Sequence, residues 1–205
     1  MQRSTLNAAV IGLGVGEQHI NAYDAHPKSK LRVICDTNAD KLSVVGEKYP
    51  NFQKTINPTH LLQDPNLNVI SIASYDNFHE SQIIEALTHG KHVFVEKPLC
   101  LFLDEAVNIS RTLRNNSNLR LSSNLILRCT PRFKDLKKRI SDGVLGKVYA
   151  IEADYNYGRI YKLTSGWRGK LDFYSVILGG GVHMIDLIRW LTESEVEEVY
   201  ATGNH

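Results

Sequence analysis

The feature that most constrains the fold is an alternation of short apolar runs with stretches of helical spacing over the first 124 residues. The apolar runs lie at residues 6–11, 31–35, 69–73, 92–95 and 120–123. The stretches with helical spacing lie between them, at residues 16–25, 39–49, 79–89 and 104–115. Short apolar runs separated by about ten helical residues are typical of β-α-β units, whose parallel strands are buried on both faces. The pattern therefore predicts an α/β fold, with a doubly wound parallel sheet over residues 1–124.

The pattern changes in the remaining part of the chain, residues 125–205. Helical spacing appears at residues 131–140 and 182–191, with a long stretch of no clear period between them at 158–179. Apolar and polar residues alternate at 148–157 and 196–202, which is typical of antiparallel strands with one exposed face. We therefore expect an incomplete α+β domain with an antiparallel sheet.

The composition excludes several classes of protein. Among 205 residues, 24 Lys and Arg stand against 22 Asp and Glu, and the net charge of +2 provides neither a nucleic-acid footprint nor a polybasic membrane patch. No apolar run approaches the length of a membrane-spanning helix. The three cysteines are widely spaced and form no C-x-x-C motif, which favours a reducing, cytoplasmic location. The eight histidines show no metal-ligand spacing, so we expect no metal site.

A glycine-rich turn directly follows the first apolar run. Gly12, Gly14 and Gly16 lie between that run and the next helical stretch, with Val15 in the same turn. In a dinucleotide-binding turn, the first glycine permits the tight turn, and the second lets the backbone approach a pyrophosphate at the helix N-terminus. The usual third glycine would stand at position 17, where this chain has glutamate and places its glycine one residue earlier. A tight strand–helix turn without a ligand is the alternative interpretation.

An acidic residue, Asp36, ends the second apolar run, 20 residues after Gly16. A carboxylate at this place can accept hydrogen bonds from the ribose hydroxyls of a dinucleotide and repels a 2′-phosphate, which favours NAD over NADP. The alternative is that Asp36 caps the following helix, although Asn38 is better placed for that role.

A lysine follows the fourth apolar run, in the segment Glu96-Lys97-Pro98. Ligands of parallel sheets gather beyond the carboxyl ends of the strands, where an ammonium group can hydrogen-bond a substrate hydroxyl and serve acid–base chemistry. A solvated surface lysine is the alternative. We interpret His19, which follows the glycine-rich turn, as a helix-packing residue rather than a ligand.

Several segments of the chain together resemble one family of oxidoreductases. The most specific are Gly-Lys-His-Val-Phe-Val-Glu-Lys-Pro-Leu at 90–99 and Gly-Gly-Gly-Val-His-Met-Ile-Asp at 179–186. Further segments that fit lie at residues 11–19, 35–38, 71–79, 128–133 and 143–146. From about residue 6 to residue 202, the chain is similar to the glucose–fructose oxidoreductase, inositol dehydrogenase and rhizopine-catabolism family (Gfo/Idh/MocA).

The resemblance implies an NAD(P)-dependent oxidoreductase that acts on a carbinol of a sugar, a cyclitol or a nucleotide-sugar. It implies an N-terminal Rossmann domain and a C-terminal domain for substrate binding, whose antiparallel sheet joins the subunits of a homo-oligomer. Lys97 matches the family's catalytic lysine, and His183 matches a histidine that serves as acid–base in many members. Further positions implied at the cofactor are Ser74, Asn77, His79 and Glu96. Positions implied near the substrate are Arg128, Trp167, Arg168 and Asp186.

The chain departs from the family pattern in two respects. Many members carry an aspartate four residues before the histidine, where this chain has Gly179, and Asp186 is a possible substitute by its i, i+3 spacing from His183. Family members are also substantially longer, and two strands alone make a marginal sheet. Either the chain is a truncated form, which we favour, or another copy completes the sheet.

The leading hypothesis is hydride transfer between such a carbinol and NAD, with Lys97 and His183 sharing the proton transfer. The alternative is a non-catalytic NAD(H)-binding regulatory or scaffold protein, which the glycine at position 179 favours. A third hypothesis is chemistry that uses the nicotinamide only transiently, such as redox-assisted cleavage of a glycoside.

Overall fold

The computed structural model describes residues 5–171 and 174–203. The chain divides into two compact units, Met1–Asn124 and Leu125–His205. The first unit carries all the paired strands found in the described residues, and the second is built of helices and irregular chain.

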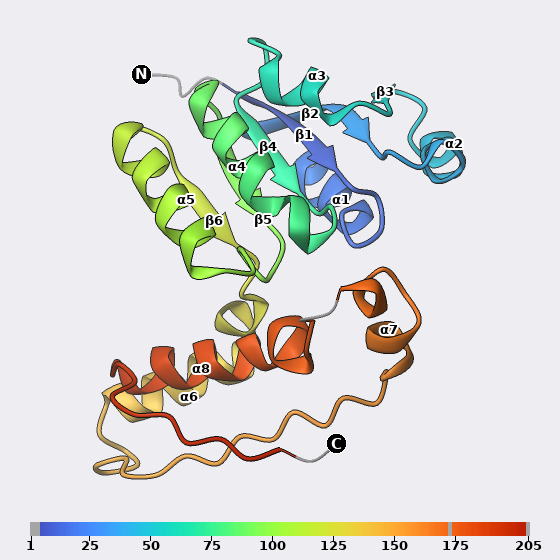
Figure 1. Ribbon diagram of the computed structural model, residues 1–205. Coiled ribbons are helices and arrows are strands. Elements are labelled where there is room, and N and C mark those ends of the chain that lie inside the picture. Colours follow the sequence, from blue (N-terminus) through green and yellow to red (C-terminus); the bar gives the residue numbers. More distant parts are fainter. Residues whose placement is uncertain (1–4, 172–173, 204–205) are drawn as a thin grey trace. The chain divides into compact units, whose positions relative to one another are not determined.

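The first unit contains a six-stranded sheet with the strand order β3-β2-β1-β4-β5-β6 (Figure 1). The strands are β1 (Leu6–Ile11), β2 (Ser29–Cys35), β3 (Gln53–Thr55), β4 (Val69–Ile72), β5 (His92–Val95) and β6 (Leu121–Ser123). All neighbouring strands pair in parallel, so the turns that follow them lie along one edge of the sheet. Because β1 lies between β2 and β4, the strand order reverses at β1, and such a reversal leaves a crevice at the carboxyl ends of the strands.

Helices cover both faces of this sheet. They are α1 (Glu17–Ala25), α2 (Ala39–Lys48), α3 (Pro58–Gln63), α4 (His79–Thr88) and α5 (Leu103–Asn115), with a short 3-10 turn η1 (Asp76–Phe78) before α4. The side chains of β1 alternate between the two faces. Ala8 and Val10 belong to a buried cluster with residues of α1 and α2, whereas Ala9 and Ile11 belong to a second cluster with residues of α3, α4 and α5. The prediction of a doubly wound parallel sheet is therefore confirmed.

The alternation of apolar runs and helical stretches does not reveal β3. Its three residues are polar, Gln-Lys-Thr, and they pair with the last residues of β2 at the edge of the sheet. An edge strand this short buries too little apolar surface to leave a pattern in the sequence.

The second unit is built around two helices, α6 (Pro131–Ser141) and α8 (Val182–Thr192), which contact each other. Shorter turns are η2 (Ile126–Cys129), α7 (Tyr161–Thr164), η3 (Arg168–Lys170) and a π-helical turn η4 (Ile177–Gly181) that leads directly into α8. The stretch 158–179 is therefore less irregular than its sequence suggests, although residues 172 and 173 lie outside the described residues. No helix in the described part of either unit is long and apolar enough to cross a membrane.

The antiparallel sheet expected in the second unit is not confirmed. Across the described residues of this unit, the segments 148–157 and 196–202 form no ladder of hydrogen bonds with each other or with other strands. Tyr149, Val199 and Tyr200 in these segments are largely exposed. Alternation of side chains only favours an extended backbone, and a strand also needs a neighbour whose N–H and C=O groups it can pair with.

One lysine is fully buried in the core of the first unit, at the amino-terminal edge of the sheet. Lys91 directly precedes β5 and is 1% exposed. Its ammonium group donates hydrogen bonds to the carbonyl oxygens of Asp64 and Leu67, at 2.5 and 3.2 Å. Burial lowers the pKa of Lys91, and the charge of Asp64 opposes that shift. The aliphatic part of the Lys91 side chain therefore packs in the core, while its ammonium group connects the loop between α3 and β4 to the start of β5.

We predict that Lys91→Met lowers the free energy of unfolding by about 1–3 kcal/mol, because the methionine preserves the buried volume but leaves two carbonyl oxygens without their donor. Urea denaturation followed by circular dichroism measures the change. Lys30→Met on β2 is the matched control, since Lys30 is exposed. Equal unfolding midpoints for the two variants would contradict the prediction.

Candidate functional site

The glycine-rich turn joins β1 to α1 and approaches the end of β4 more closely than any side chain permits. Gly12 has a φ of +85°, and a Cβ atom there would lie 2.2 Å from the carbonyl oxygen of Ala73. A Cβ atom at Gly16 would lie 2.0 Å from the carbonyl oxygen of Gly12. Only glycine fits at these two positions, which explains why the chain places a glycine at position 16 although the usual pattern has one at 17.

The middle of the same turn is open. A Cβ atom at Gly14 would meet nothing within 4 Å, and the neighbouring Val15 is 59% exposed. Gly16, which precedes α1, offers no side chain to cap the helix N-terminus. Bare backbone beside a helix N-terminus is what a dinucleotide pyrophosphate requires, so the residues present fit this group.

Asp36, at the end of β2, supports the turn from the side. Its Oδ2 accepts a hydrogen bond from the backbone N–H of Leu13 at 2.8 Å, and its Oδ1 accepts one from that of Asn38 at 2.9 Å. Asn38, not Asp36, caps α2, because its Oδ1 accepts from the backbone N–H of Lys41. A carboxylate offers about four acceptor directions, so capacity remains for ribose hydroxyls.

Sequence reasoning did not consider Lys41 at this place. Its Nζ lies 3.5 Å from Oδ2 of Asp36, and its side chain is 41% exposed. The signal that could have found it is its position in the first turn of the helix that Asn38 caps, because that turn faces the end of β2. The ribose side of the site therefore presents a buried carboxylate with an ammonium group beside it.

The chain after β4 carries Ser74 in the loop, Asn77 in η1 and His79 at the start of α4. Ser74 donates a hydrogen bond to Oε1 of Gln82 at 2.8 Å, and Asn77 is exposed. His79 is fully buried, with Nδ1 2.7 Å from the carbonyl oxygen of Pro98 and Nε2 3.3 Å from that of Ser74. The imidazole thus ties the loop after β4 to the loop after β5.

The segment Glu96-Lys97-Pro98 follows β5 directly, and the peptide bond between Lys97 and Pro98 is cis. Glu96 is buried, whereas Lys97 is partly exposed. Oε1 of Glu96 accepts hydrogen bonds from Nε2 of His19 at 3.1 Å and from Nδ2 of Asn124 at 2.7 Å. Burial alone raises the pKa of Glu96, but the hydrogen bonds from His19 and Asn124 outweigh it, so the pKa lies below its ordinary value. Glu96 is therefore a carboxylate directed into the protein, beside the predicted catalytic lysine.

These turns lie along one edge of the sheet. Gly12, Asp36, Ser74 and Lys97 follow β1, β2, β4 and β5 within two residues of each strand end, and these four strands are neighbours in the sheet. The fold therefore brings together residues that are up to 85 positions apart in the sequence. The arrangement can hold an extended ligand across the strand ends, with a carboxylate toward one end and an amine toward the other.

The second unit contains the other predicted site residues. Arg128 in η2 donates from Nε and Nη2 to both carboxylate oxygens of Asp186 in α8, at 2.8 and 2.5 Å. These hydrogen bonds raise the pKa of Arg128. Asp186 is buried and lies one helical turn after His183 on α8. Its carboxylate is therefore held by Arg128, and its suggested role as an orienting group for His183 stays a prediction.

Trp167 and Arg168 form an aromatic and cationic cluster with Tyr174. The guanidinium of Arg168 lies 4.4 Å from the centroid of the Trp167 ring and donates from Nε to the Tyr174 hydroxyl at 3.0 Å. A Cβ atom at Gly179 would lie 3.2 Å from the Tyr174 ring. Tyr174 therefore packs against the position where many family members carry an aspartate.

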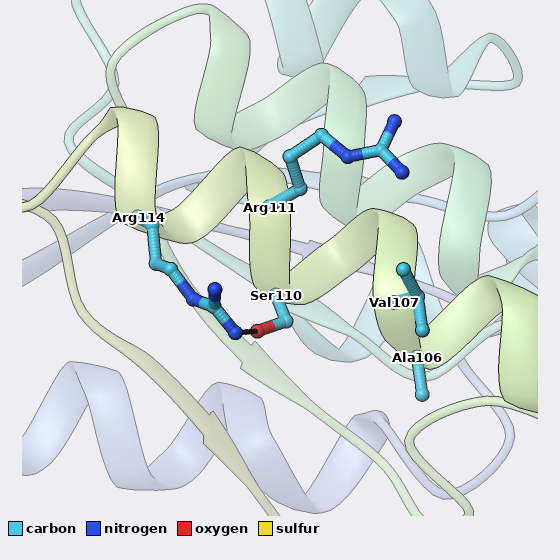
Figure 2. Close-up of a pocket in the computed structure, with 5 residues that line it drawn as sticks. All are labelled: Ala106, Val107, Ser110, Arg111 and Arg114. Atoms are coloured by element: carbon cyan, nitrogen blue, oxygen red, sulfur yellow. Dashed lines mark hydrogen bonds between the residues drawn. The ribbon is translucent and has the colours of Figure 1, made fainter.

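A separate hollow of about 290 Å³ lies along α5. Figure 2 shows Arg114 turned toward Ser110, to which it donates a hydrogen bond, while Arg111 extends in another direction. The lining has no carboxylate or imidazole that could act as a base. Within the described ranges 5–171 and 174–203, no group of three or more His, Cys, Asp or Glu side chains is placed to hold a metal ion.

Two family models match this chain. Residues 6–124 match the family model of the oxidoreductase family with an NAD-binding Rossmann fold. Residues 133–205 match the model of the GFO/IDH/MocA C-terminal domain. Together these matches cover most of both units.

Individual relatives are similar over nearly the whole chain. A myo-inositol 2-dehydrogenase of Thermotoga maritima is 27% identical over 97% of this chain and 58% of its own length. A D-glucoside 3-dehydrogenase of Escherichia coli is 28% identical over 93% of this chain and 55% of its own length. The crystal structure of a myo-inositol 2-dehydrogenase from Lactobacillus plantarum superimposes with a TM-score of 0.79 at 26% identity, over 93% of this chain and 57% of that one. The chain spans a little more than half the length of these relatives, and it belongs to the GFO/IDH/MocA family of oxidoreductases.

Proposed function

We propose that this chain carries the cofactor site and part of the substrate site of an NAD-dependent dehydrogenase that acts on a carbinol of a sugar or cyclitol. The observation that carries the proposal is the turn after β1, where Gly12 and Gly16 are sterically obligatory while Gly14 faces open space. A turn that only joined a strand to a helix would not need an exposed glycine between two crowded ones. The bound nicotinamide would accept or supply the hydride.

NAD is the cofactor that the ribose side of the site favours. Asp36 is a buried carboxylate at the end of β2, and its negative charge opposes a 2′-phosphate. Lys41 offsets part of that charge at 3.5 Å. The carboxylate is nevertheless held in place by two backbone N–H groups, whereas the lysine side chain is 41% exposed, so we assign the preference for NAD to Asp36.

Lys97 and His183 are the groups that we propose for proton transfer. When a carbinol is oxidised to a carbonyl, its carbon loses a hydride and its oxygen loses a proton, and a base must receive that proton. Lys97 follows β5 at the edge where the dinucleotide would lie, and it carries an amine that can bind the substrate oxygen. His183 lies in the first turn of α8 and would share the transfer as a second acid–base group.

The relatives and the second unit both support one class of substrate. Two relatives are an inositol dehydrogenase and a glucoside dehydrogenase, and inositols and glucosides are polyhydroxylated rings. Arg128, paired with Asp186, and the Trp167–Arg168 cluster would offer donors and a stacking surface to such a ring. We propose a sugar or polyol substrate on this basis.

We also propose a homo-oligomer in a reducing, cytoplasmic location. The exposed Tyr149, Val199 and Tyr200 of the second unit support an interface there. The free state of Cys35, Cys100 and Cys129 supports a reducing compartment.

We predict that Gly14→Ala weakens NADH binding about tenfold or more without lowering the unfolding midpoint, because the added methyl group meets no protein atom but stands where the dinucleotide would approach. Titration with NADH and with NADPH, followed by fluorescence, measures both affinities. Gly158→Ala is the matched control, since a Cβ atom there also meets nothing within 4 Å. Absence of binding of either coenzyme to the wild-type chain would refute the proposed function.

We predict that Lys97→Ala, in a form that turns over, lowers the rate of NADH formation roughly 10²–10⁴-fold and leaves NADH affinity nearly intact, because the variant loses the group that handles the proton. The measurement is a steady-state assay over a panel of inositols and glucosides. An unchanged rate would remove Lys97 from the mechanism. Coenzyme binding without turnover on any member of the panel would favour the non-catalytic alternative.

A further inference from the structure

We propose that His19, Glu96 and Asn124 form a positioning device that fixes the Lys97 turn to the helix after the glycine-rich turn. The role that we propose for these residues rests on the proposed function. The proposed reaction needs the Lys97 amine at a set distance from a cofactor bound at the glycine-rich turn. Its geometry rests only on contacts within the first unit. These three residues are positioning residues, since none of them is argued to touch the substrate.

The contacts form a short path between the two turns. The backbone N–H of His19 donates to the carbonyl oxygen of Gly16 at 2.9 Å, so the histidine lies one helical turn beyond the glycine-rich segment. Its Nε2 lies 3.1 Å from Oε1 of Glu96. The other carboxylate oxygen, Oε2, accepts from the backbone N–H of Lys97 at 3.3 Å. One carboxylate therefore joins α1 to the backbone of Lys97.

Asn124 ties the same carboxylate to the end of β6. Its Nδ2 donates to Oε1 of Glu96 at 2.7 Å. The carboxylate thus receives three donors from three different elements, α1, the chain after β6 and the Lys97 turn itself. A carboxylate held by three donors has little freedom to rotate, so the backbone bonded to it is fixed as well.

The polarity of the hydrogen bonds determines which nitrogen of His19 matters. Glu96 is ionised and can only accept, so the proton of the His19–Glu96 bond resides on Nε2. Nδ1 lies 2.8 Å from the hydroxyl of Ser71 on β4, which can either donate or accept. The imidazole ring also packs edge-on against the Phe94 ring, with the two ring centroids 5.4 Å apart. Three separable roles are therefore present: donation to Glu96, contact with Ser71, and packing against Phe94.

A purely structural histidine would not need this arrangement. His19 and Ser71 are 8% and 0% exposed, so a pair of apolar side chains would fill the same space. Burial of the Glu96 carboxylate is costly and is offset only because its donors are all in place. We infer that the chain keeps a buried carboxylate at Glu96 because the carboxylate fixes the position of the adjacent Lys97.

Two substitutions at His19 separate these roles. In His19→Gln the side-chain amide nitrogen reaches about as far as Nε2, so it can still donate to Glu96. In His19→Asn the amide reaches only about as far as Nδ1, so it can meet Ser71 but not Glu96. The readout is the rate at which an amine-reactive acetylating reagent labels Lys97, determined by mass spectrometry of peptides from the folded chain. Labelling of exposed Lys28 and Lys30 in the same sample normalises the rates.

We expect His19→Asn to change the Lys97 labelling rate about threefold or more, the effect of losing one hydrogen bond, and His19→Gln to keep it close to the wild-type rate. Lys91→Met controls for lost stability, because it acts at the opposite end of β5 and should leave Lys97 labelling unchanged. If His19→Asn does not fold, Asn124→Ser takes its place, because it removes the second side-chain donor to Glu96. The same threefold change in the Lys97 labelling rate is then expected.

Equal Lys97 rates in the wild type and in His19→Asn would overturn the proposal. Equal changes in the Gln and Asn variants would also overturn it, because packing of the ring would then explain the effect. Titration with NADH is run in parallel. If the wild type binds no coenzyme while the labelling separates the two variants, the proposed function fails but the positioning device stands.

Discussion

The contact on which the rest of the site depends is the close approach of Gly12 to the backbone of Ala73. It brings the turn after β1 against the turn after β4, at the place where the strand order reverses. With a side chain at position 12, the two turns would have to separate by more than 1 Å to reach ordinary contact distances. The open backbone at Gly14 and the exposed start of α1 are available to a ligand only because this contact lets the turn fold back so tightly.

Two buried carboxylates hold the turns on either side of that contact. Asp36 accepts from the backbone of Leu13 inside the glycine-rich turn, and Glu96 accepts from the backbone of Lys97. Each carboxylate also receives donors from a neighbouring helix or strand end, which offsets the cost of burying its charge. The site is therefore built from main-chain turns that are fixed by charged hydrogen bonds, whereas the side chains that would perform chemistry remain partly accessible.

In the second unit, the helices form but the expected strands do not. Arg128 and Asp186 come from η2 and α8 and form a bidentate ion pair that joins these two elements. The segments 148–157 and 196–202 have the alternation of strands but no partner among the described residues. Helices satisfy their own backbone groups, so α6 and α8 form here, whereas a strand forms only beside another strand that pairs with its backbone.

Residue patterns predict the parallel sheet, the glycine-rich turn and the cap at Asn38, and the resemblance of several segments indicates the family. The sheet, the turn and the cap depend on local signals, namely the period of apolar residues, the placement of glycines and the residue types that suit a helix start. The hydrogen-bond partners of the buried polar residues, in contrast, become apparent only in the folded chain. His19 and His79 bond to groups 77 and 19 positions away, and Asp186 to a group 58 positions away. Such partners are chosen by the packing of whole elements, and the spacing of residues along the chain carries no record of that choice.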